Sequence, residues 1–264
     1  MLHVEHVSKT FFPGTINEKK ALQDLSLHLE PGDFATVIGG NGAGKSTTLN
    51  AIAGVFPIDK GKIIIDGEDI TKKPEHKRAK YIGRVFQDPM LGNAAGMMIE
   101  ENLSLAARRG ETPGLGWSLS SDQHDRFYEL LKELDLGLED RMTAKVGLLS
   151  GGQRQALTLL MATLKKPKLL LLDEHTAALD PKTAAKVLAL TEKIVTRDQL
   201  TTLMITHNMR DALRYGNRLI MLHNGRVIID VKGEKKQHLQ IADLLDMFEK
   251  ASGSEMASDR LLLG

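Results

Sequence analysis

Apolar and polar side chains alternate at the start of the chain and predict strands that are buried on one face. One alternating run extends from Leu2 to Val7, and a second places leucine at every other position from Leu25 to Leu29. A period of two residues is typical of half-buried strands. The pattern therefore predicts an N-terminal antiparallel β subdomain.

From Phe34 onward the pattern changes to short strands that are apolar on both phases. Such runs occupy residues 34–38, 63–65, 82–86, 169–172 and 202–206. Strands with this composition are typical of a parallel sheet covered by helices on both faces. A glycine-rich turn and a helix from about Lys45 to Ala53 follow the first run. We therefore expect an α/β fold around a parallel sheet, with residues 63–65 among its strands.

The strand pattern is interrupted between Gln87 and Leu149. This stretch holds a Gly- and Met-rich loop at 90–98, helical patterns near 100–109 and 122–134, and a break at Pro113-Gly114. We interpret it as a helical subdomain, at about 88–150, inserted into the sheet domain.

The C-terminal part returns to alternating helix and strand signals. A short helix is expected after Thr206, then a hairpin around Asn224-Gly225, because Asn-Gly is a strong signal for a two-residue turn. A last helix is predicted from about 236 to 250. On this interpretation residues 1–250 form one domain and 251–264 a flexible tail.

Composition and charge narrow the functional classes. The 264 residues hold 35 Lys and Arg against 34 Asp and Glu, so the formal charge of +1 provides no excess positive field for nucleic acid. The absence of Cys excludes disulfides, thiolate metal sites and cysteine nucleophiles. No apolar run approaches the roughly 18 residues of a membrane span, and the start lacks a signal-peptide core. We expect a cytoplasmic protein that reaches a membrane only through a partner.

One glycine-rich run matches the phosphate-binding pattern G-x-x-x-x-G-K-[ST]. It is Gly39-Gly40-Asn41-Gly42-Ala43-Gly44-Lys45-Ser46, placed after a buried strand and at the start of a helix. Glycines let backbone N–H groups surround phosphates, and the helix N-terminus adds partial positive charge. Lys45 would reach the terminal phosphates, and the Ser46 hydroxyl would bind Mg²⁺. The run predicts a nucleoside triphosphate site.

Two carboxylates end the apolar strand at 169–172. Asp173 and Glu174 follow four consecutive leucines, and ligands bind at the carboxyl ends of strands in open α/β sheets. Asp173 suits a metal shell, and Glu174 suits orienting or deprotonating an attacking water. Beside a phosphate loop, this interpretation outweighs that of a merely solvated strand end.

The segment Leu149-Ser150-Gly151-Gly152-Gln153 precedes an amphipathic helical pattern and has two interpretations. Ser150 and Gln153 form an S-x-x-Q capping box, which explains the pair without any ligand. The two glycines destabilise a helix and are useful where a backbone must approach another group closely. Spacing alone leaves these alternatives open.

Taken in order, these motifs resemble the ATP-binding subunit of ABC transporters across nearly the whole chain. The resemblance rests on Gly39–Ser46, Gln87, Leu149–Gln153, Leu169–Glu174, Ala178-Leu179-Asp180 and His207. It implies a P-loop NTPase sheet domain that binds ATP and Mg²⁺ and forms a head-to-tail homodimer on ATP binding. Each ATP would lie between the phosphate loop of one chain and Ser150 to Gly152 of the other.

The resemblance also assigns roles to individual residues. Gln87 matches the glutamine that contacts Mg²⁺ or water, His207 the histidine that contacts the γ-phosphate, and Asp180 an aspartate at the dimer contact. Phe11 stands where the family places an aromatic ring against adenine, with Phe12 as a rival and a core role open for either.

The resemblance thus implies three sets of site residues. The catalytic set is Glu174, His207 and Gln87, and the metal set is Ser46, Gln87 and Asp173. The nucleotide set is Phe11, Gly39, Gly40, Asn41, Gly42, Ala43, Gly44, Lys45, Ser46, Thr47, Ser150, Gly151, Gly152, Gln153 and Asp180.

One departure from the family pattern is His175, which stands where proline usually follows the two acids. A histidine there is expected to titrate near neutral pH beside the presumed base, although a spacer role is the simpler interpretation. The runs DEHTAALD, ITHNM and YGNRLIML resemble the ATPase of a bacterial importer group. That group pairs a substrate-binding lipoprotein with an integral permease, and aromatic amino acids are a suggested cargo.

The resulting hypothesis is an ATP-hydrolysing motor, peripheral to the cytoplasmic face of the cell membrane. Within transport, the alternative is the ATPase of an exporter or a lipoprotein-extracting complex. Soluble ABC ATPases of DNA repair carry a long coiled coil, which residues 87–149 are too short to form. Translation factors of the superfamily usually fuse two ATPase domains, whereas this chain has one phosphate-loop motif.

Overall fold

The computed structural model describes residues 1–111 and 120–252. The described chain divides into two compact units, one formed by Met1–Arg78 with the residues from Gln199 onward and the other within Ala79–Asp198. The second unit therefore contains strands and a long helix in addition to the helices expected between 88 and 150. The Pro113-Gly114 break and nearly all of the expected C-terminal tail lie outside the described residues.

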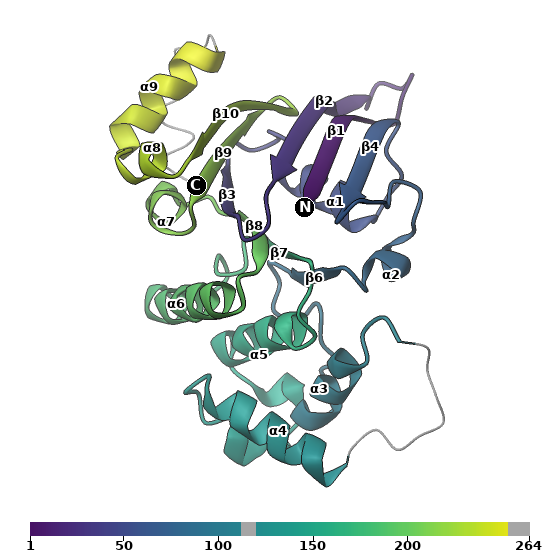
Figure 1. Ribbon diagram of the computed structural model, residues 1–264, viewed down its shortest axis with the longest axis vertical. Helices are drawn as coiled ribbons and strands as arrows, with labels where there is room; N and C mark the ends of the chain where they lie inside the picture. The colour runs from purple at the N-terminus through teal and green to yellow at the C-terminus, as the bar shows by residue number, and fades with distance from the viewer. Residues whose placement is uncertain (112–119, 253–264) are drawn as a thin grey trace. The chain divides into compact units, whose positions relative to one another are not determined.

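The first unit contains the predicted antiparallel sheet, in the order β2-β1-β4-β5 (Figure 1). Its strands are β1 (Leu2–Phe11), β2 (Lys19–Leu29), β4 (Lys60–Ile65) and β5 (Glu68–Asp69). Strand β1 pairs with both neighbours, so that Leu2 faces Leu29 on one side and Ile65 on the other. The prediction that residues 63–65 belong to the parallel sheet is therefore wrong. Their doubly apolar pattern did not reveal which strand would pair with them.

Strand β1 is irregular, and this allows its apolar residues to share one face. Val4 and Val7 are both buried although an odd spacing would place them on opposite faces. The register shifts between them, and His6 has a φ of 51°. This irregularity rotates the strand and returns Val7 to the core.

The same unit holds a second group of strands in the order β10-β9-β3-β8. They are β3 (Phe34–Ile38), β8 (Thr201–Ile205), β9 (Arg218–His223) and β10 (Arg226–Lys232). Strand β3 is parallel to both β8 and β9, and β9 and β10 form the predicted hairpin. All five residues of β3 are buried, as its doubly apolar sequence predicts.

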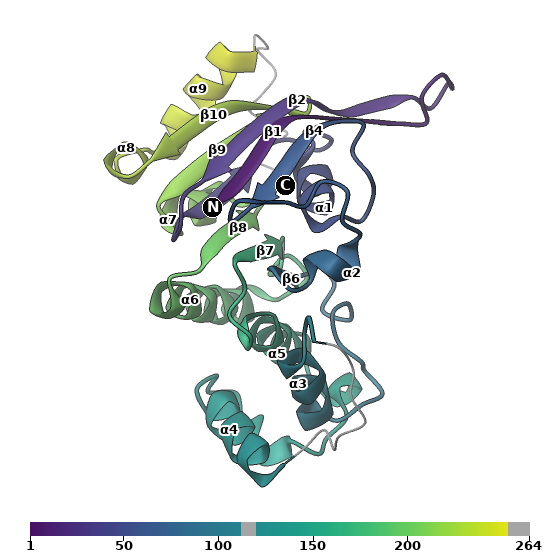
Figure 2. The ribbon, with the colours of Figure 1, turned by 45° about the vertical axis from the view of Figure 1, so that its right-hand side comes forward.

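The helices of this unit are α1 (Lys45–Ala53), α2 (Glu75–Arg78), α7 (Met209–Arg214), α8 (Glu234–Gln237) and α9 (Ile241–Ser252). The predicted single helix from 236 to 250 is thus wrong, because two helices occupy this stretch. Lys236 is buried and donates hydrogen bonds to the carbonyls of Tyr215 and Gly216, which ties α8 to the end of α7. The Asp243 carboxylate accepts from the Gln240 N–H and begins a new helix. Figure 2 shows α8 and α9 as separate helices beyond β10.

The second unit combines a parallel strand pair with helices. Strands β6 (Ile82–Val85) and β7 (Leu169–Asp173) pair along their length. The helices are α3 (Ile99–Ala107), α4 (Ser121–Lys132), α5 (Gly151–Thr163) and α6 (Pro181–Asp198), with single 3₁₀ turns at Glu139–Arg141 and Val146–Leu148. Phe127 and Leu131 of α4 pack with Leu103 of α3 and Leu157 of α5 in one core. No helix in the described parts of the chain is long and apolar enough to cross a bilayer.

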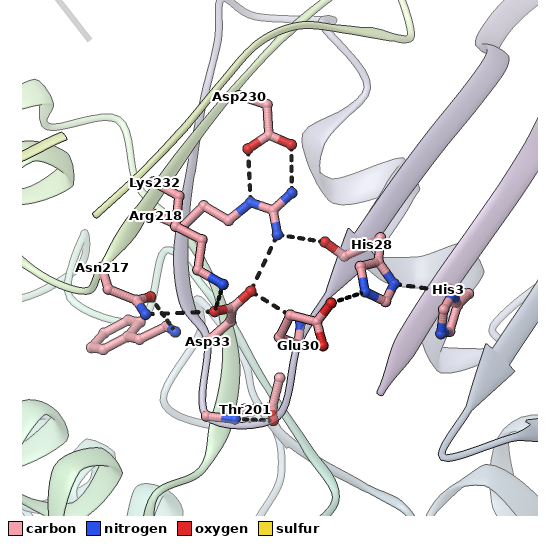
Figure 3. A network of polar contacts seen from close by, with 11 residues as sticks. His3, His28, Glu30, Asp33, Thr201, Asn217, Arg218, Asp230 and Lys232 are labelled. Atoms are coloured by element: carbon pink, nitrogen blue, oxygen red, sulfur yellow. Dashed lines mark hydrogen bonds and ion pairs between the residues drawn. The ribbon is translucent and has the colours of Figure 1, made fainter. Parts of the chain in front are cut away.

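Buried Asp33 is the centre of an ionic network that extends to the β9–β10 hairpin of the first unit (Figure 3). Its carboxylate accepts from Lys232 Nζ at 2.7 Å, from Arg218 Nη1 at 3.2 Å and from the Glu30 N–H at 3.0 Å. Arg218 also pairs with Asp230 through two hydrogen bonds. Burial alone would raise the pKa of Asp33, but the bonds from Lys232 and Glu30 hold it below its ordinary value. The network therefore fastens the turn before β3 to the β9–β10 hairpin.

We predict that Asp33→Asn lowers the free energy of unfolding by about 1.5–3 kcal/mol, the usual range for hydrogen bonds to charged groups. Asp24→Asn is the matched control, because the Asp24 carboxylate pairs with His6 at a site where 69% of the Asp24 side chain is exposed. That pair should contribute less than about 1 kcal/mol. Urea unfolding of the two variants measures the difference, and equal losses would contradict a structural role for the network.

Candidate functional site

The loop between β3 and α1 has the backbone conformation that the glycine pattern predicts. Gly39, Gly42 and Gly44 have φ values of 148°, 79° and 102°, which residues with side chains rarely adopt. Gly44 stands at the N-cap of α1, and no side chain among the described residues caps this helix. The amides at a helix N-terminus attract anions, so the loop has the geometry of a phosphate cradle.

The Lys45 side chain is folded back along this loop. Only 6% of Lys45 is exposed, and its Nζ donates to the Gly39 carbonyl at 2.7 Å and the Gly40 carbonyl at 3.3 Å. The Thr48 hydroxyl donates to the Gly44 carbonyl and secures the first turn of α1. The Lys45 ammonium group thus lies against the carbonyl oxygens at the start of its own loop.

His207 leaves the strand next to the loop. Strand β8 is parallel to β3, and the Thr206 N–H donates to the Val37 carbonyl at 3.2 Å. Asn208 then caps α7 by accepting from the Arg210 and Asp211 amides. Because parallel strands end at the same edge, His207 and the loop that begins at Gly39 emerge at one edge of the first unit.

The two aromatic candidates for the base of a nucleotide occupy different environments. Phe11 is half-buried and packs edge-on against Phe56, with 5.1 Å between ring centroids, while Lys9 Nζ lies 5.6 Å from both centroids. Phe12 is 66% exposed and has a φ of 52°. Phe11 therefore presents a ring held in place by neighbours, which suits stacking better than the exposed ring of Phe12.

The second unit brings the other strand-end residues together. Strands β6 and β7 are parallel with Val85 opposite Leu172, so Gln87 and Asp173 emerge at the same edge. Arg84 lies 3.7 Å from the Asp173 carboxylate. Carboxylate and amide oxygens are donors that Mg²⁺ accepts, and this ion usually takes only one or two protein ligands beside substrate phosphates.

Glu174 follows β7 in a conformation that is uncommon for a non-glycine residue. Its φ is 46°, and 8% of the residue is exposed. The Ala177 N–H donates to the Glu174 carbonyl at 2.9 Å and closes the turn. A left-handed backbone at a buried carboxylate is the kind of local strain that gathers at functional sites.

His175, which departs from the family pattern, is fully enclosed. Its Nε2 lies 3.0 Å from Thr191 Oγ1, and the Thr191 hydroxyl donates to the Val187 carbonyl at 2.8 Å. Since the hydroxyl has a single proton, it accepts from the N–H at Nε2, which identifies the nitrogen that carries a proton. Burial lowers the pKa of His175 to about 4. The expectation that this histidine titrates near neutral pH is therefore wrong, because desolvation disfavours its charged form.

Ser150 and Gln153 form the capping box that their spacing predicts, at the N-terminus of α5. Ser150 Oγ accepts from the Gln153 N–H at 3.2 Å, and Gln153 Oε1 accepts from the Ser150 N–H at 3.1 Å. A Cβ on Gly152 would lie 2.1 Å from Thr183 Cγ2, so any larger residue here would force the Thr183 side chain to move, and close helix packing favours glycine. Ser150 and Gly151 are exposed at the start of α5. Packing thus explains Gly152, while the exposed pair stays available to a ligand.

Asp180 has a structural partner of its own. Its carboxylate accepts from the Thr183 N–H at 3.1 Å in the first turn of α6. Hydrogen bonds from the side chain and backbone of Thr183 lower the pKa of Asp180 below its ordinary value. Asp180 is therefore ionised at neutral pH and stands at a helix start on the surface.

Sequence reasoning missed two residues of α5 that connect its N-terminus to the segment after β6. Gln155 is fully buried and donates to the Phe86 carbonyl at 3.1 Å, immediately before Gln87. Arg154 donates to the carbonyls of Gly147 and Leu149 and lies 2.7 Å from Met90 Sδ. The signal available in the sequence for Gln155 was a polar residue beside the apolar positions Ala156 and Leu157 of the predicted helix.

Comparison with known proteins agrees with this geometry. The ABC transporter family profile matches residues 22–177. The "Tyrosine transport ATP-binding protein" of Clostridioides difficile (strain R20291) is 46% identical over 252 residues, covering 95% of this chain and 100% of that protein. The "Methionine import ATP-binding protein MetN" of Lactobacillus delbrueckii subsp. bulgaricus is 32% identical, covering 97% of this chain and 72% of the relative.

Solved structures show the same fold. A dimeric ATP-binding cassette in a post-hydrolysis state, bound to ADP and Pi, superposes with a TM-score of 0.75 at 30% identity and covers 88% of this chain and 98% of its own. A nucleotide-free cassette from an ABC transporter gives a TM-score of 0.74 at 26% identity, covering 100% and 99%. Fold and site define a P-loop ATPase. The chain belongs to the ABC transporter family as one of its ATP-binding, ATP-hydrolysing subunits.

The buried neutral His175 predicts a specific pH dependence of stability. Its folded pKa of about 4 lies below the unfolded value of about 6.5, so the unfolded chain gains a proton first as the pH falls. The wild type should therefore lose about 2 kcal/mol more unfolding free energy than His175→Gln between pH 7 and pH 5. Glutamine keeps a donor for Thr191 and does not titrate. Equal losses in urea unfolding would show that His175 is not buried in its neutral form.

Proposed function

We propose that this chain is the motor subunit of an importer that works with a separate integral permease and a substrate-binding lipoprotein. The observation that carries the proposal is the phosphate loop, in which three glycines adopt positive φ just before α1. Among the described residues, no side chain caps the N-terminus of this helix. The importer assignment draws support from relatives that are named for tyrosine transport and methionine import. Tyrosine or a related aromatic amino acid is the proposed cargo.

The proposed chemistry assigns one task to each group. Backbone amides from Gly40 to Thr47 and the Lys45 ammonium bind the phosphates of ATP, and Phe11 stacks on adenine. Glu174 takes a proton from the attacking water, while Gln87 and His207 orient that water and the γ-phosphate. Mg²⁺, held by Ser46 and Asp173, would neutralise the phosphate charge when bound.

The buried, left-handed position of Glu174 supports its role as the base. Glu174 is 8% exposed, and the turn that Ala177 closes fixes the backbone from which its carboxylate extends. Neutral His175, anchored to α6 through Thr191, adds no competing charge beside it. Proton abstraction thus depends on Glu174 alone among the residues of this turn.

The proposed dimer is head to tail and forms on ATP binding. Ser150 and Gly151 are exposed at the N-terminus of α5, where backbone amides and the helix dipole favour an anion. Together with Gly152, Gln153 and Asp180, they would complete the nucleotide site of the partner chain. The dimeric state of the related cassette bound to ADP and Pi supports the formation of a dimer.

We propose that residues 88–98 form the docking site for the permease. The contact would lie at the cytoplasmic face of the membrane. Met90, Leu91 and Met98 are 48%, 52% and 37% exposed, which is unusual for large apolar side chains gathered in one short segment. Arg154 of α5 contacts Met90 in this segment, and Gln155 donates to Phe86 just before it, so movement of the segment would be transmitted to the helix that begins at Gly151.

Glu174→Gln tests the hydrolytic role, because glutamine keeps the shape of the side chain and removes the base. Turnover should fall by roughly 10²–10⁴-fold, while ATP binding survives. The variant should then accumulate as an ATP-dependent dimer that size-exclusion chromatography with ATP and Mg²⁺ detects, and ADP should return it to monomer. Glu133→Gln is the matched control, since Glu133 is an exposed partner of Arg197 and should retain parental turnover.

Two results would count against parts of the proposal. Parental hydrolysis by Glu174→Gln would remove Glu174 from the catalytic role. An inactive variant that binds ATP but never dimerises would contradict the head-to-tail arrangement.

The permease contact can be tested by cross-linking, because the chain has no native Cys. Leu91→Cys, labelled with a short photoactivatable reagent in native membranes, should capture one integral membrane protein. Val55→Cys is the control: Val55 is similarly exposed, at 48%, but lies in the first unit. Capture of the same membrane protein from both positions, or of soluble proteins only, would exclude docking at this segment.

A further inference from the structure

The turn between β9 and β10 contacts the phosphate loop directly. Asn224 and Gly225 form this turn with φ values of 47° and 73°. The Gly225 N–H donates to the carbonyl of Ala43, inside the loop, at 2.9 Å. A residue about 180 positions further along the chain thus bonds to the backbone that the proposed function assigns to ATP.

The other side of the same turn is fixed to β2. The Gln23 N–H donates to the Gly225 carbonyl at 3.0 Å, and Gln23 Nε2 donates to the Asn224 carbonyl at 3.0 Å. The turn therefore lies between β2 and the phosphate loop, with hydrogen bonds on both sides. Its position cannot change without stretching one set or the other.

Neighbouring backbone atoms leave no space for a side chain at Gly225 or at Gly44. A Cβ on Gly225 would lie 2.6 Å from the Ala21 carbonyl oxygen and 2.9 Å from Leu22 Cα. A Cβ on Gly44 would lie 2.9 Å from the same Ala21 oxygen and 3.2 Å from Gly225 Cα. The backbones of β2, the turn and the phosphate loop thus pack directly on one another. A backbone atom cannot rotate out of the way as the end of a long side chain can.

The start of the loop is enclosed by the same hairpin. A Cβ on Gly39 would lie 2.3 Å from the Leu222 carbonyl oxygen, two residues before the turn. The β9–β10 hairpin therefore limits the loop at Gly39, at Ala43 and at Gly44. These are the beginning, the last residue before the helix cap, and the cap itself.

We propose that the Asn224–Gly225 turn is a positioning element for nucleotide binding, with Gly225 as its essential residue. It holds the phosphate loop in its binding conformation, so that ATP does not have to order the loop. The inference rests on the proposed role of Gly39–Ser46 in binding phosphate. It also links ATP affinity to the C-terminal helix, because the His223 ring beside the turn packs edge-on against Phe248 of α9 at 5.3 Å.

A second Asx-Gly turn in the same unit provides a matched control. Asp66 and Gly67 join β4 to β5 with φ values of 54° and 80°, close to those of Asn224 and Gly225. A Cβ on Gly67 would have no heavy atom within 4 Å. Gly67→Ala and Gly225→Ala therefore share the cost of alanine at positive φ, but only Gly225→Ala displaces a turn from β2 and from Ala43.

Isothermal titration with ATP should show the dissociation constant of Gly225→Ala raised about three- to tenfold, as expected for one lost backbone hydrogen bond. Gly67→Ala should bind as the wild type does. At saturating ATP, kcat of Gly225→Ala should stay within about twofold of the wild type while KM rises, which a general loss of folded protein would not produce. Equal ATP affinity in the two variants would overturn the inference.

Lys45→Ala separates failure of this inference from failure of the proposed function. If Lys45→Ala weakens ATP binding and Gly225→Ala does not, the loop binds phosphate and the turn does not position it. If Lys45→Ala leaves ATP affinity unchanged, the assignment of the loop itself is wrong, and the inference is overturned with it.

Amide hydrogen exchange of the wild type tests the same coupling without a variant that must fold. Coupling between two sites is reciprocal, so saturating ADP should slow exchange of the Gly225 N–H and leave the Gly67 N–H unaffected. Slower exchange of the loop amides with no change at Gly225 would overturn the inference.

Discussion

Close packing of backbone against backbone around the loop from Gly39 to Gly44 is the constraint on which the rest of the site depends. The loop adopts φ values that only glycine tolerates easily. Such a segment has little conformational preference of its own. Its order comes from β3 and α1 at its ends and from the carbonyls of Ala21 and Leu222, which leave no room for a Cβ.

Parallel strand pairing does similar work in each unit. In the first unit β3 and β8 end together, which places His207 at the same edge as the loop. In the second, β6 and β7 end together, which places Gln87 and Asp173 at one edge. Within each unit, residues far apart in the chain thus lie at the same edge of the sheet, because parallel strands share a direction. The polar site residues come directly after the apolar strands, at their carboxyl ends.

Several candidate site residues have a structural role beside the functional one that we propose for them. Ser150 and Asp180 each satisfy amides at the start of a helix, α5 and α6 respectively, and the same geometry leaves them at the surface. His175 illustrates the opposite case, in which a titratable residue beside Glu174 is made inert by burial and by Thr191. Its hydrogen bond to α6 makes it an anchor for the turn that carries Glu174.

Local patterns in the sequence determined the features that depend on neighbouring residues. These are the phosphate loop, the helix at Lys45–Ala53, the Asn224-Gly225 hairpin, the capping box at Ser150 and the α/β class, because turn chemistry, capping and periodicity act over a few positions. Tertiary structure alone decided the antiparallel pairing of 63–65, the division of the last helix at buried Lys236, the neutral state of His175 and the close approach of Thr183 to Gly152. Each of these depends on which distant group occupies the adjacent space, and neither hydrophobic period nor local spacing carries that information.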